Sequence, residues 1–237
     1  MQSTSVGDLT RRAIRWKPVK RLAIPALAGA LLLLTLAYWW QSNLVHELAG
    51  MAMFVLVARH IYVNRAWILR IFRGTYDGRR WLATALHLGL LANMLLLVAT
   101  SLVISQSVFA FLPIPTNVTV RDLHWLGAYW LVVTVGIHLG LHWSRVMALA
   151  RSILRITTKS APRRWALRLL ALVFVLIGAW SWSAMGVGTK LSWGRSLDFW
   201  DFSRSVAPFF VHWAGVLAMP AVLTYYVSKL RQTRAAG

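Results

Sequence analysis

The chain has 237 residues, of which 58% are hydrophobic and only 14% charged, and it carries a formal net charge of +20. Soluble domains contain about 25% charged residues, and neither a disordered chain nor a soluble nucleic-acid-binding protein would contain this much apolar sequence. An apolar chain with a basic excess is typical of an integral membrane protein, which has the lipid bilayer as its partner and no nucleic acid. The chain has no cysteine, which excludes disulfides, iron–sulfur clusters and covalently attached c-type haem.

Six segments are long and apolar enough to cross a membrane as helices, which takes about 20 residues each. In chain order these segments are 22–41, 44–66, 82–105, 121–147, 165–184 and 206–228. The sixth has the weakest pattern, because Ser205, His212 and Pro220 interrupt it. The first is expected to be retained, since its polar lead-in is too long for a typical cleaved signal peptide. The predicted fold class is all-α, a polytopic membrane bundle of six transmembrane helices.

Lys and Arg are concentrated in alternate connecting segments and the span ends beside them. Only four of the 26 lie on the opposite side, namely Arg121, Lys190, Arg195 and Arg204. The positive-inside rule therefore predicts a multi-pass membrane protein with both termini in the cytoplasm. The chain accordingly divides into a basic tail (1–21), a four-span core (22–147), a basic loop (148–164), two further spans (165–228) with an interfacial outer segment (185–205), and a basic tail (229–237).

Two of the predicted spans carry histidines with the same spacing. His46 and His60 on the second span are 14 positions apart, and so are His124 and His138 on the fourth. Fourteen residues are close to four helical turns, so each pair shares one helix face and is separated by about 21 Å along the axis. The two spans run in the same direction. Their first histidines therefore share an outer level and their second histidines an inner level.

These levels predict two cofactor sites, each with a pair of metal ligands. His46 with His124, and His60 with His138, would bracket a planar group, and two axial imidazoles without cysteine fit one haem b at each level. The alternative for each histidine is a hydrogen-bonded packing role, but ionisable groups inside spans are costly and the equal spacings favour ligation. Four nearby glycines would make room for the ring or pack against a neighbouring helix: Gly50, Gly127, Gly136 and Gly140.

The segments around these histidines resemble bacterial di-haem membrane cytochromes b. The matching segments are 46–50 (HELAG), 59–65 (RHIYVNR), 124–127 (HWLG) and 138–143 (HLGLHW). The similarity is to an uncharacterised-domain branch of small multi-span proteins in that superfamily, and it covers residues 44–147. The resemblance implies a di-haem four-helix core in which two b-type haems carry electrons across the membrane. It also implies a location in the bacterial inner (cytoplasmic) membrane.

Three further histidines have open roles. His142 follows His138 by one helical turn and is an alternative inner ligand, although His138 alone preserves the matched spacing. His87, on the third span, is expected at the inner level. For His87 and His142 the alternatives are haem ligation, contact with a quinone head group, or packing. His212, on the sixth span, is expected at the outer level, and packing is its favoured role.

A few charged residues lie close to the predicted ligands. Arg59 precedes His60, and it would either pair with a haem propionate or extend to the cytoplasmic surface. Arg145 has the same two alternatives, with the surface role favoured. Glu47, beside His46, would either accept a proton from a quinol or be an exposed interfacial carboxylate, which is the favoured alternative.

The leading functional hypothesis is a di-haem cytochrome b that relays electrons between the quinone pool and a separate redox protein. An electron-transfer subunit is favoured over a complete enzyme. The first alternative is a stand-alone haem-dependent quinol oxidase or reductase. The second is a non-redox transporter or scaffold that uses the histidines as a proton or metal path. Against the second, no predicted span has an Asp or Glu in its interior.

Overall fold

The computed structural model describes residues 6–112, 114–194 and 200–234, and in these ranges it contains helices and no strands. The long helices are α1 (Val6–Leu36), α2 (Asn43–Asn64), α3 (Gly78–Ile104), α4 (Val118–Ile153), α5 (Ala161–Ala184) and α7 (Ala207–Arg234). The short ones are α6 (Val187–Leu191) and two 3₁₀ helices, η1 (Tyr38–Trp40) and η2 (Arg65–Arg70). The all-α class is therefore confirmed.

Across the described ranges, six helical segments are long and apolar enough to cross a membrane, as predicted. They are Val19–Leu36, Asn43–Arg70, Arg80–Ile104, Val118–Ile153, Ala161–Ala184 and Ala207–Thr233. The boundaries differ most for the first and fourth predicted spans. Helix α1 begins far before residue 22 and ends at Leu36, and α4 extends beyond 121–147 at both ends. Helix α7 continues through Pro220, the residue that had weakened the sixth pattern.

Polar side chains fix where four of the long helices begin. Ser42, Asp77, Asn117 and Ser160 each accept a hydrogen bond from the backbone N–H three residues later, at the starts of α2, α3, α4 and α5. Such caps satisfy an amide that has no partner within the helix, and each stabilises the helix by about 1 kcal/mol. Single polar residues in the sequence therefore mark the helix starts more clearly than the helix ends.

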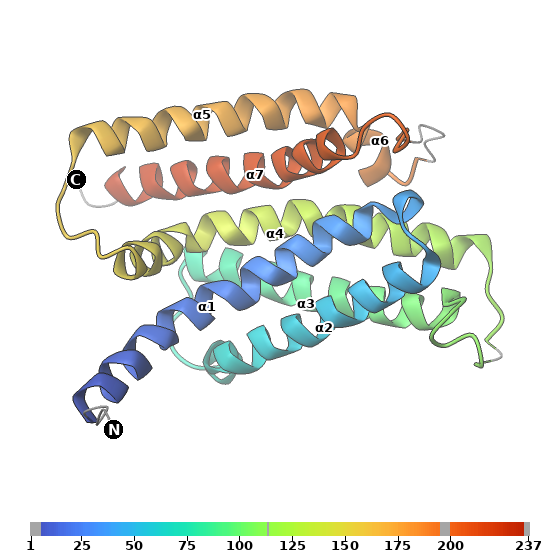
Figure 1. The fold of residues 1–237 in the computed structure, drawn as a ribbon, viewed down its shortest axis with the longest axis horizontal. Coiled ribbons are helices and arrows are strands. Elements are labelled where there is room, and N and C mark those ends of the chain that lie inside the picture. The colour runs from blue at the N-terminus through green and yellow to red at the C-terminus, as the bar shows by residue number, and fades with distance from the viewer. Residues whose placement is uncertain (1–5, 113, 195–199, 235–237) are drawn as a thin grey trace, which may run out of the picture.

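Helix α4 is the centre of the bundle. Helices α5 and α7 lie side by side along one side of α4, while α1, α2 and α3 lie on its other side (Figure 1). Helix α4 packs on α3, α7 and α1, whereas α2 packs mainly on α1. Leu131 and Val132 of α4 and Trp213 and Val216 of α7 are buried between these helices. This arrangement leaves α2 without close backbone packing against α4 over the part of the chain described.

Glycines allow α4 and α7 to approach each other closely. A Cβ atom at Gly136 would overlap the Leu217 carbonyl oxygen, and one at Gly140 would overlap that of Ala221. Both glycines therefore serve helix packing, which decides between their two predicted roles. Gly127 is close to α3, while no heavy atom of the described residues lies within 4 Å of a Cβ built at Gly50. Gly50 is thus the predicted glycine that leaves open space.

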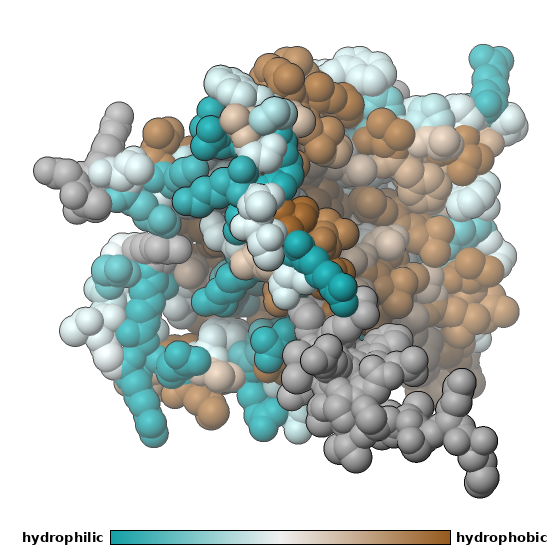
Figure 2. Space-filling model, turned by 60° about the vertical axis from the view of Figure 1, so that its left-hand side comes forward, coloured by the Kyte–Doolittle hydropathy of each residue, from teal (hydrophilic) through white to brown (hydrophobic). Residues whose placement is uncertain are grey.

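The two ends of the bundle differ in their connections. The start of α1, the α2–α3 and α4–α5 connections and the end of α7 lie at one end, and η1, the α3–α4 connection and α6 lie at the other (Figure 1). Hydrophilic residues gather over the first end, while hydrophobic residues cover the flank (Figure 2). Large apolar side chains are exposed to a high fraction, such as Val55 (68%) and Leu176 (60%). Such a surface suits contact with lipid tails.

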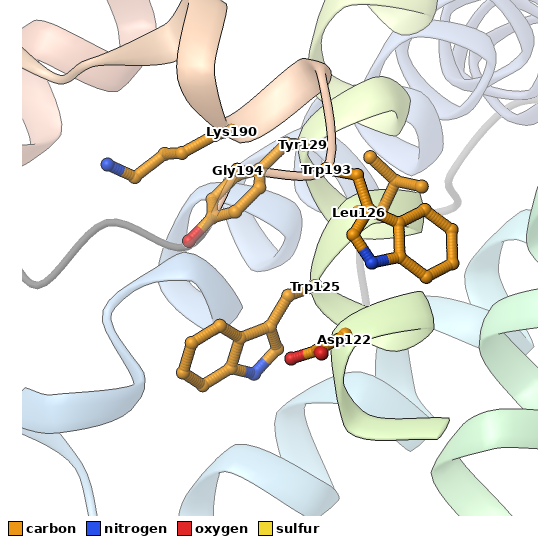
Figure 3. Close-up of a pocket in the computed structure, with 7 residues that line it drawn as sticks. All are labelled: Asp122, Trp125, Leu126, Tyr129, Lys190, Trp193 and Gly194. Carbon is orange, nitrogen blue, oxygen red and sulfur yellow. The ribbon is translucent and has the colours of Figure 1, made fainter. Parts of the chain in front are cut away.

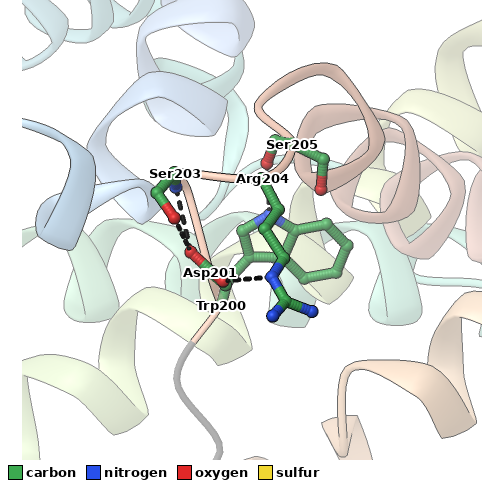
Figure 4. Close-up of polar contacts among 5 residues, drawn as sticks. All are labelled: Trp200, Asp201, Ser203, Arg204 and Ser205. Atoms are coloured by element: carbon green, nitrogen blue, oxygen red, sulfur yellow. Dashed lines mark hydrogen bonds and ion pairs between the residues drawn. The ribbon is translucent and has the colours of Figure 1, made fainter.

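The predicted interfacial segment 185–205 is a short helix followed by a turn, and its residues 195–199 lie outside the described residues. In the turn, the Trp200 indole N–H donates to the Ser205 carbonyl oxygen at 2.7 Å, and Arg204 forms an ion pair with Asp201 at 3.2 Å (Figure 4). The Ser203 hydroxyl donates to Asp201, and this hydrogen bond lowers the pKa of the Asp201 carboxyl below its usual value. These local contacts order the turn before α7.

Candidate functional site

The structure brings His46 of α2 beside His124 of α4 at the end of the bundle that carries η1. Their ring centroids are 6.5 Å apart and the ring planes are inclined by 68°. The ring of Tyr38, in η1, meets the His46 ring edge-on at 5.0 Å. The two histidines that the sequence placed at an outer level therefore lie next to each other, and we call them the outer pair.

Thr100 of α3 orients the imidazole of His124. The Thr100 hydroxyl oxygen lies 3.0 Å from Nδ1 of His124 and 2.8 Å from the Leu96 carbonyl oxygen. The Thr100 hydroxyl has one proton, and a carbonyl oxygen can only accept, which means that the hydroxyl donates its proton to the Leu96 carbonyl oxygen. The hydroxyl oxygen then accepts a hydrogen bond from the His124 Nδ1–H. This tautomer leaves a lone pair on Nε2 of His124, the form in which a histidine binds a metal.

His60 of α2 lies beside His138 of α4, nearer the opposite end. Their ring centroids are 6.3 Å apart and their planes are inclined by 81°. We call them the inner pair. The Nδ1 atoms of His46 and His138 are buried and have no hydrogen-bond partner among the described residues. A buried polar atom without a partner costs about 1–3 kcal/mol and usually indicates a missing water or ligand.

The separations within both pairs match two imidazoles bound to one metal. When two imidazoles bind one metal from opposite sides, metal–nitrogen bonds of about 2 Å, with about 1.1 Å from each nitrogen to its ring centre, give centroids about 6.3 Å apart. The measured values are 6.5 and 6.3 Å. Histidines in direct contact elsewhere in the bundle are closer, since His138 and His142 are 4.7 Å apart. The two rings within each pair are therefore farther apart than the rings of His138 and His142.

The inner level gathers more histidines than the outer pair. His87 of α3 and His142 of α4 stack with planes 9° from parallel, and their Nε2 atoms are 3.1 Å apart. The His87 ring is also 5.1 Å from His138, and Trp67 of η2 lies 5.0 Å from it. The sequence placed His87 at this level, but it gave no signal of the contact between His87 and His142.

Arg59 and Arg145 lie at exposed positions near the inner level. The Arg59 guanidinium lies 5.9 Å from the centre of the Tyr62 ring, on its own helix. Extension toward the surface along the helix, one of the two predicted alternatives for Arg59, matches this position.

Glu47 has a role that the sequence did not indicate. Its carboxylate accepts hydrogen bonds from the Asn43 side chain, the Ser105 hydroxyl and the backbone N–H groups of residues 106–108, over 2.6–3.1 Å. All of these donors except Asn43, which lies on α2, follow the end of α3. Glu47 therefore ties α2 to the α3–α4 connection, and it is half-buried where the favoured expectation was an exposed interfacial carboxylate.

His212 lies in the interface between α5 and α7. It is buried, its Nδ1 is 2.9 Å from the Ser181 hydroxyl, and the rings of Trp180 and Trp200 are 4.6 and 5.5 Å away. The Nδ1 atom of His212 therefore has a hydrogen-bond partner in the core, and the ring packs against two tryptophans. The favoured packing role of His212 matches this position.

A small cavity of about 50 Å³ lies close to the outer pair, between the start of α4 and α6 (Figure 3). Its lining includes Asp122 and Trp125 of α4, together with Lys190 and Trp193. Lys190 donates to the Met185 carbonyl oxygen at 2.8 Å. A cavity of this size has room for very few water molecules, so it does not extend the outer pair into a larger binding site.

Comparison with known proteins gave no match to a protein-family model, to a curated protein or to a solved structure.

Proposed function

We propose that the chain is a di-haem b-type membrane cytochrome that relays electrons across the membrane between the quinone pool and a separate redox protein. One observation carries this proposal. Two histidine pairs from the same two helices lie at two levels, and each pair has the separation of two imidazoles that share a metal. Residues His46 and His124 would hold one haem, and His60 and His138 the other.

A haem suits the pairs better than a bare ion does. A bare transition-metal ion usually takes four or more protein ligands or waters, whereas a haem iron takes four nitrogens from the macrocycle and needs two from the protein. The outer pair offers two imidazoles. Gly50, one helical turn after His46 on the same face, leaves open space within 4 Å of a Cβ position. Loose packing between α2 and α4 further supports a flat apolar group between them.

The haem would supply a reversible one-electron couple, and the protein would supply orientation and surroundings. The Thr100 hydroxyl holds His124 in the tautomer whose Nε2 lone pair is available. Tyr38 restricts the rotation of His46 from one side. The half-buried positions of these rings between apolar helices lower the local dielectric, which together with the imidazole ligands sets the potential.

The charge distribution supports an orientation in which the basic end faces the cytoplasm. Residues 6–21, 148–164 and 229–234 belong to the same end of the bundle (Figure 1) and contain 14 of the 26 Lys and Arg residues. The resemblance to bacterial di-haem cytochromes b favours a bacterial inner-membrane location, and the positive-inside rule then favours an outer pair near the external surface. The inner pair would lie near the cytoplasmic surface, where Arg59 is available to a propionate or to anionic lipid.

The test is the haem content of the full chain purified in detergent. We expect two non-covalent b-type haems per chain in a pyridine haemochrome assay. We also expect a quinol analogue to reduce both haems, with or without a redox partner in the assay. A monodisperse, helical preparation that is produced with ample haem and contains none would contradict the proposal. Haem that a quinol analogue fails to reduce would leave the cytochrome assignment and remove the quinone pool as its donor.

A further inference from the structure

The inner level has two more imidazoles than a haem requires. His138 and His142 are four residues apart on α4, so they lie on one helix face, and His87 reaches them from α3. One ring nitrogen from each of His87, His138 and His142 lies within 4.8 Å of the other two. We call these three residues the histidine triad.

The triad has the donor set and nearly the spacing of a transition-metal site. Nitrogens bound to one tetrahedral metal at about 2.0–2.1 Å lie about 3.3 Å from each other. The Nε2 atoms of His87 and His142 are 3.1 Å apart and form a hydrogen bond, which a bound ion would replace. A ring nitrogen of His138, within 4.8 Å of the other two, would have to move by at most about 1.5 Å to reach that spacing. The Nδ1 atom of His138 has no hydrogen-bond partner among the described residues to hold the ring in place.

We propose that the histidine triad binds one divalent transition-metal ion, of the class of Zn²⁺, Co²⁺, Ni²⁺ and Cu²⁺. Neutral imidazole suits these ions, whereas Mg²⁺ and Ca²⁺ require oxygen ligands that the triad does not contain. The proposal rests on the proposed function in one respect. His138 belongs both to the triad and to the inner pair, so the ion and the inner haem exclude each other.

The triad is open enough to receive an ion. All three histidines are half-buried, and none is sealed in the core. They lie toward the end of the bundle formed by the α2–α3 and α4–α5 connections, and Trp67 of the α2–α3 connection packs on His87. A metal site needs such an entry path as well as its ligands.

The experiment uses the full chain with His60→Ala, which removes an inner-pair ligand and leaves the triad intact. Cobalt(II) chloride is titrated into the detergent-purified variant, and bound ion is measured by the visible absorption of coordinated Co²⁺ and by elemental analysis. We expect one Co²⁺ per chain. A second substitution, His87→Ala or His142→Ala, is expected to weaken binding at least about 100-fold, because loss of a ligand costs more than loss of a supporting contact.

His46→Ala in the same background is the matched control, because it removes a histidine outside the triad. It is expected to leave the Co²⁺ affinity unchanged. Absence of stoichiometric Co²⁺ binding in His60→Ala, or binding that persists after loss of His87 and of His142, would overturn the proposal. Haem added to the wild-type chain is expected to displace Co²⁺, and haem added to His60→Ala is not. If the wild-type chain binds no haem, the cobalt titration still tests the metal site independently of the proposed function.

Discussion

The Thr100 hydroxyl oxygen lies 3.0 Å from Nδ1 of His124, and it is fixed there by its own hydrogen bond to the Leu96 carbonyl oxygen. A residue of α3 thereby sets the ring orientation and the tautomer of a histidine on α4. The contact joins two residues that lie 24 positions apart, and it ties the outer pair to a helix that carries neither of its members.

Removal of the Thr100 hydroxyl should weaken the binding of the haem held by the outer pair. Thr100→Val keeps the shape but leaves the His124 Nδ1–H without an acceptor, and loss of such a supporting contact costs about 10–100-fold in metal affinity. Haem titration of the apoprotein would measure the change. Thr100→Ser keeps the hydroxyl and should retain wild-type affinity. Equal haem affinity in the Val and Ser variants would show that Thr100 does not support the ligand.

The histidines should lose haem in pairs. His46→Ala and His124→Ala should each remove the same haem, while His60→Ala and His138→Ala should each remove the other, because each iron would lose one of two axial ligands. Haem stoichiometry with the potential of the remaining haem would identify which one is lost. The double variant His46→Ala/His124→Ala should lose no more haem than either single variant. A different pairing, such as His46 with His138, would contradict the arrangement by levels.

Glycine substitution should separate the packing glycines from the open positions. Gly136→Ala and Gly140→Ala place a Cβ against backbone carbonyl oxygens of α7, which side-chain movement cannot relieve. We expect destabilisation of about 1–3 kcal/mol each. At Gly29 of α1, no described heavy atom lies within 4 Å of a built Cβ. Gly29→Ala should therefore be neutral or stabilising by up to about 1 kcal/mol, since alanine favours the helix. Thermal unfolding in detergent would compare the three variants.

Glu47 should keep the backbone of the segment after α3 ordered. Glu47→Ala removes the acceptor for the N–H groups of Gln106, Ser107 and Val108, so their amide hydrogen exchange should become at least about tenfold faster. Glu47→Gln keeps one carbonyl oxygen and should lie between the alanine variant and the wild type. Unchanged exchange at these amides, with a loss of quinol-dependent haem reduction, would instead support the proton-accepting role.

The absence of native cysteines makes the orientation easy to test. Single cysteines in place of Thr116, in the α3–α4 connection, and Thr157, in the α4–α5 connection, lie at exposed positions at opposite ends of the bundle. A membrane-impermeant thiol reagent applied to intact cells with a permeable outer membrane should label Thr116→Cys and spare Thr157→Cys. The opposite labelling pattern would reverse the proposed orientation and exchange the outer and inner levels.

The spans and the pairing of histidines by level were predictable from local patterns. Apolar stretches of sufficient length predict the six helices, and Ser42, Asp77, Asn117 and Ser160 mark where four of them begin. The 14-residue spacing depends on helix geometry alone. It therefore predicted that His46 would lie level with His124, and His60 with His138.

Residue spacing along the sequence did not indicate what each residue touches across helices. Gly136 and Gly140 resemble Gly50 in sequence context, and only the packing of α7 on α4 separates their roles. The same holds for Glu47, because its donors from residues 105–108 follow the end of α3, nearly 60 residues further along the chain.

Length, composition and charge by themselves determined that this is an apolar, all-helical chain with six segments able to cross a membrane, since each of those properties depends on residues close together in sequence. The tertiary structure decided how the helices associate. It set the 6.5 and 6.3 Å separations within the two pairs, and it placed His87 3.1 Å from His142. Those distances depend on the packing of α2, α3 and α4 against their neighbours, and packing is a property of facing surfaces that no single helix contains.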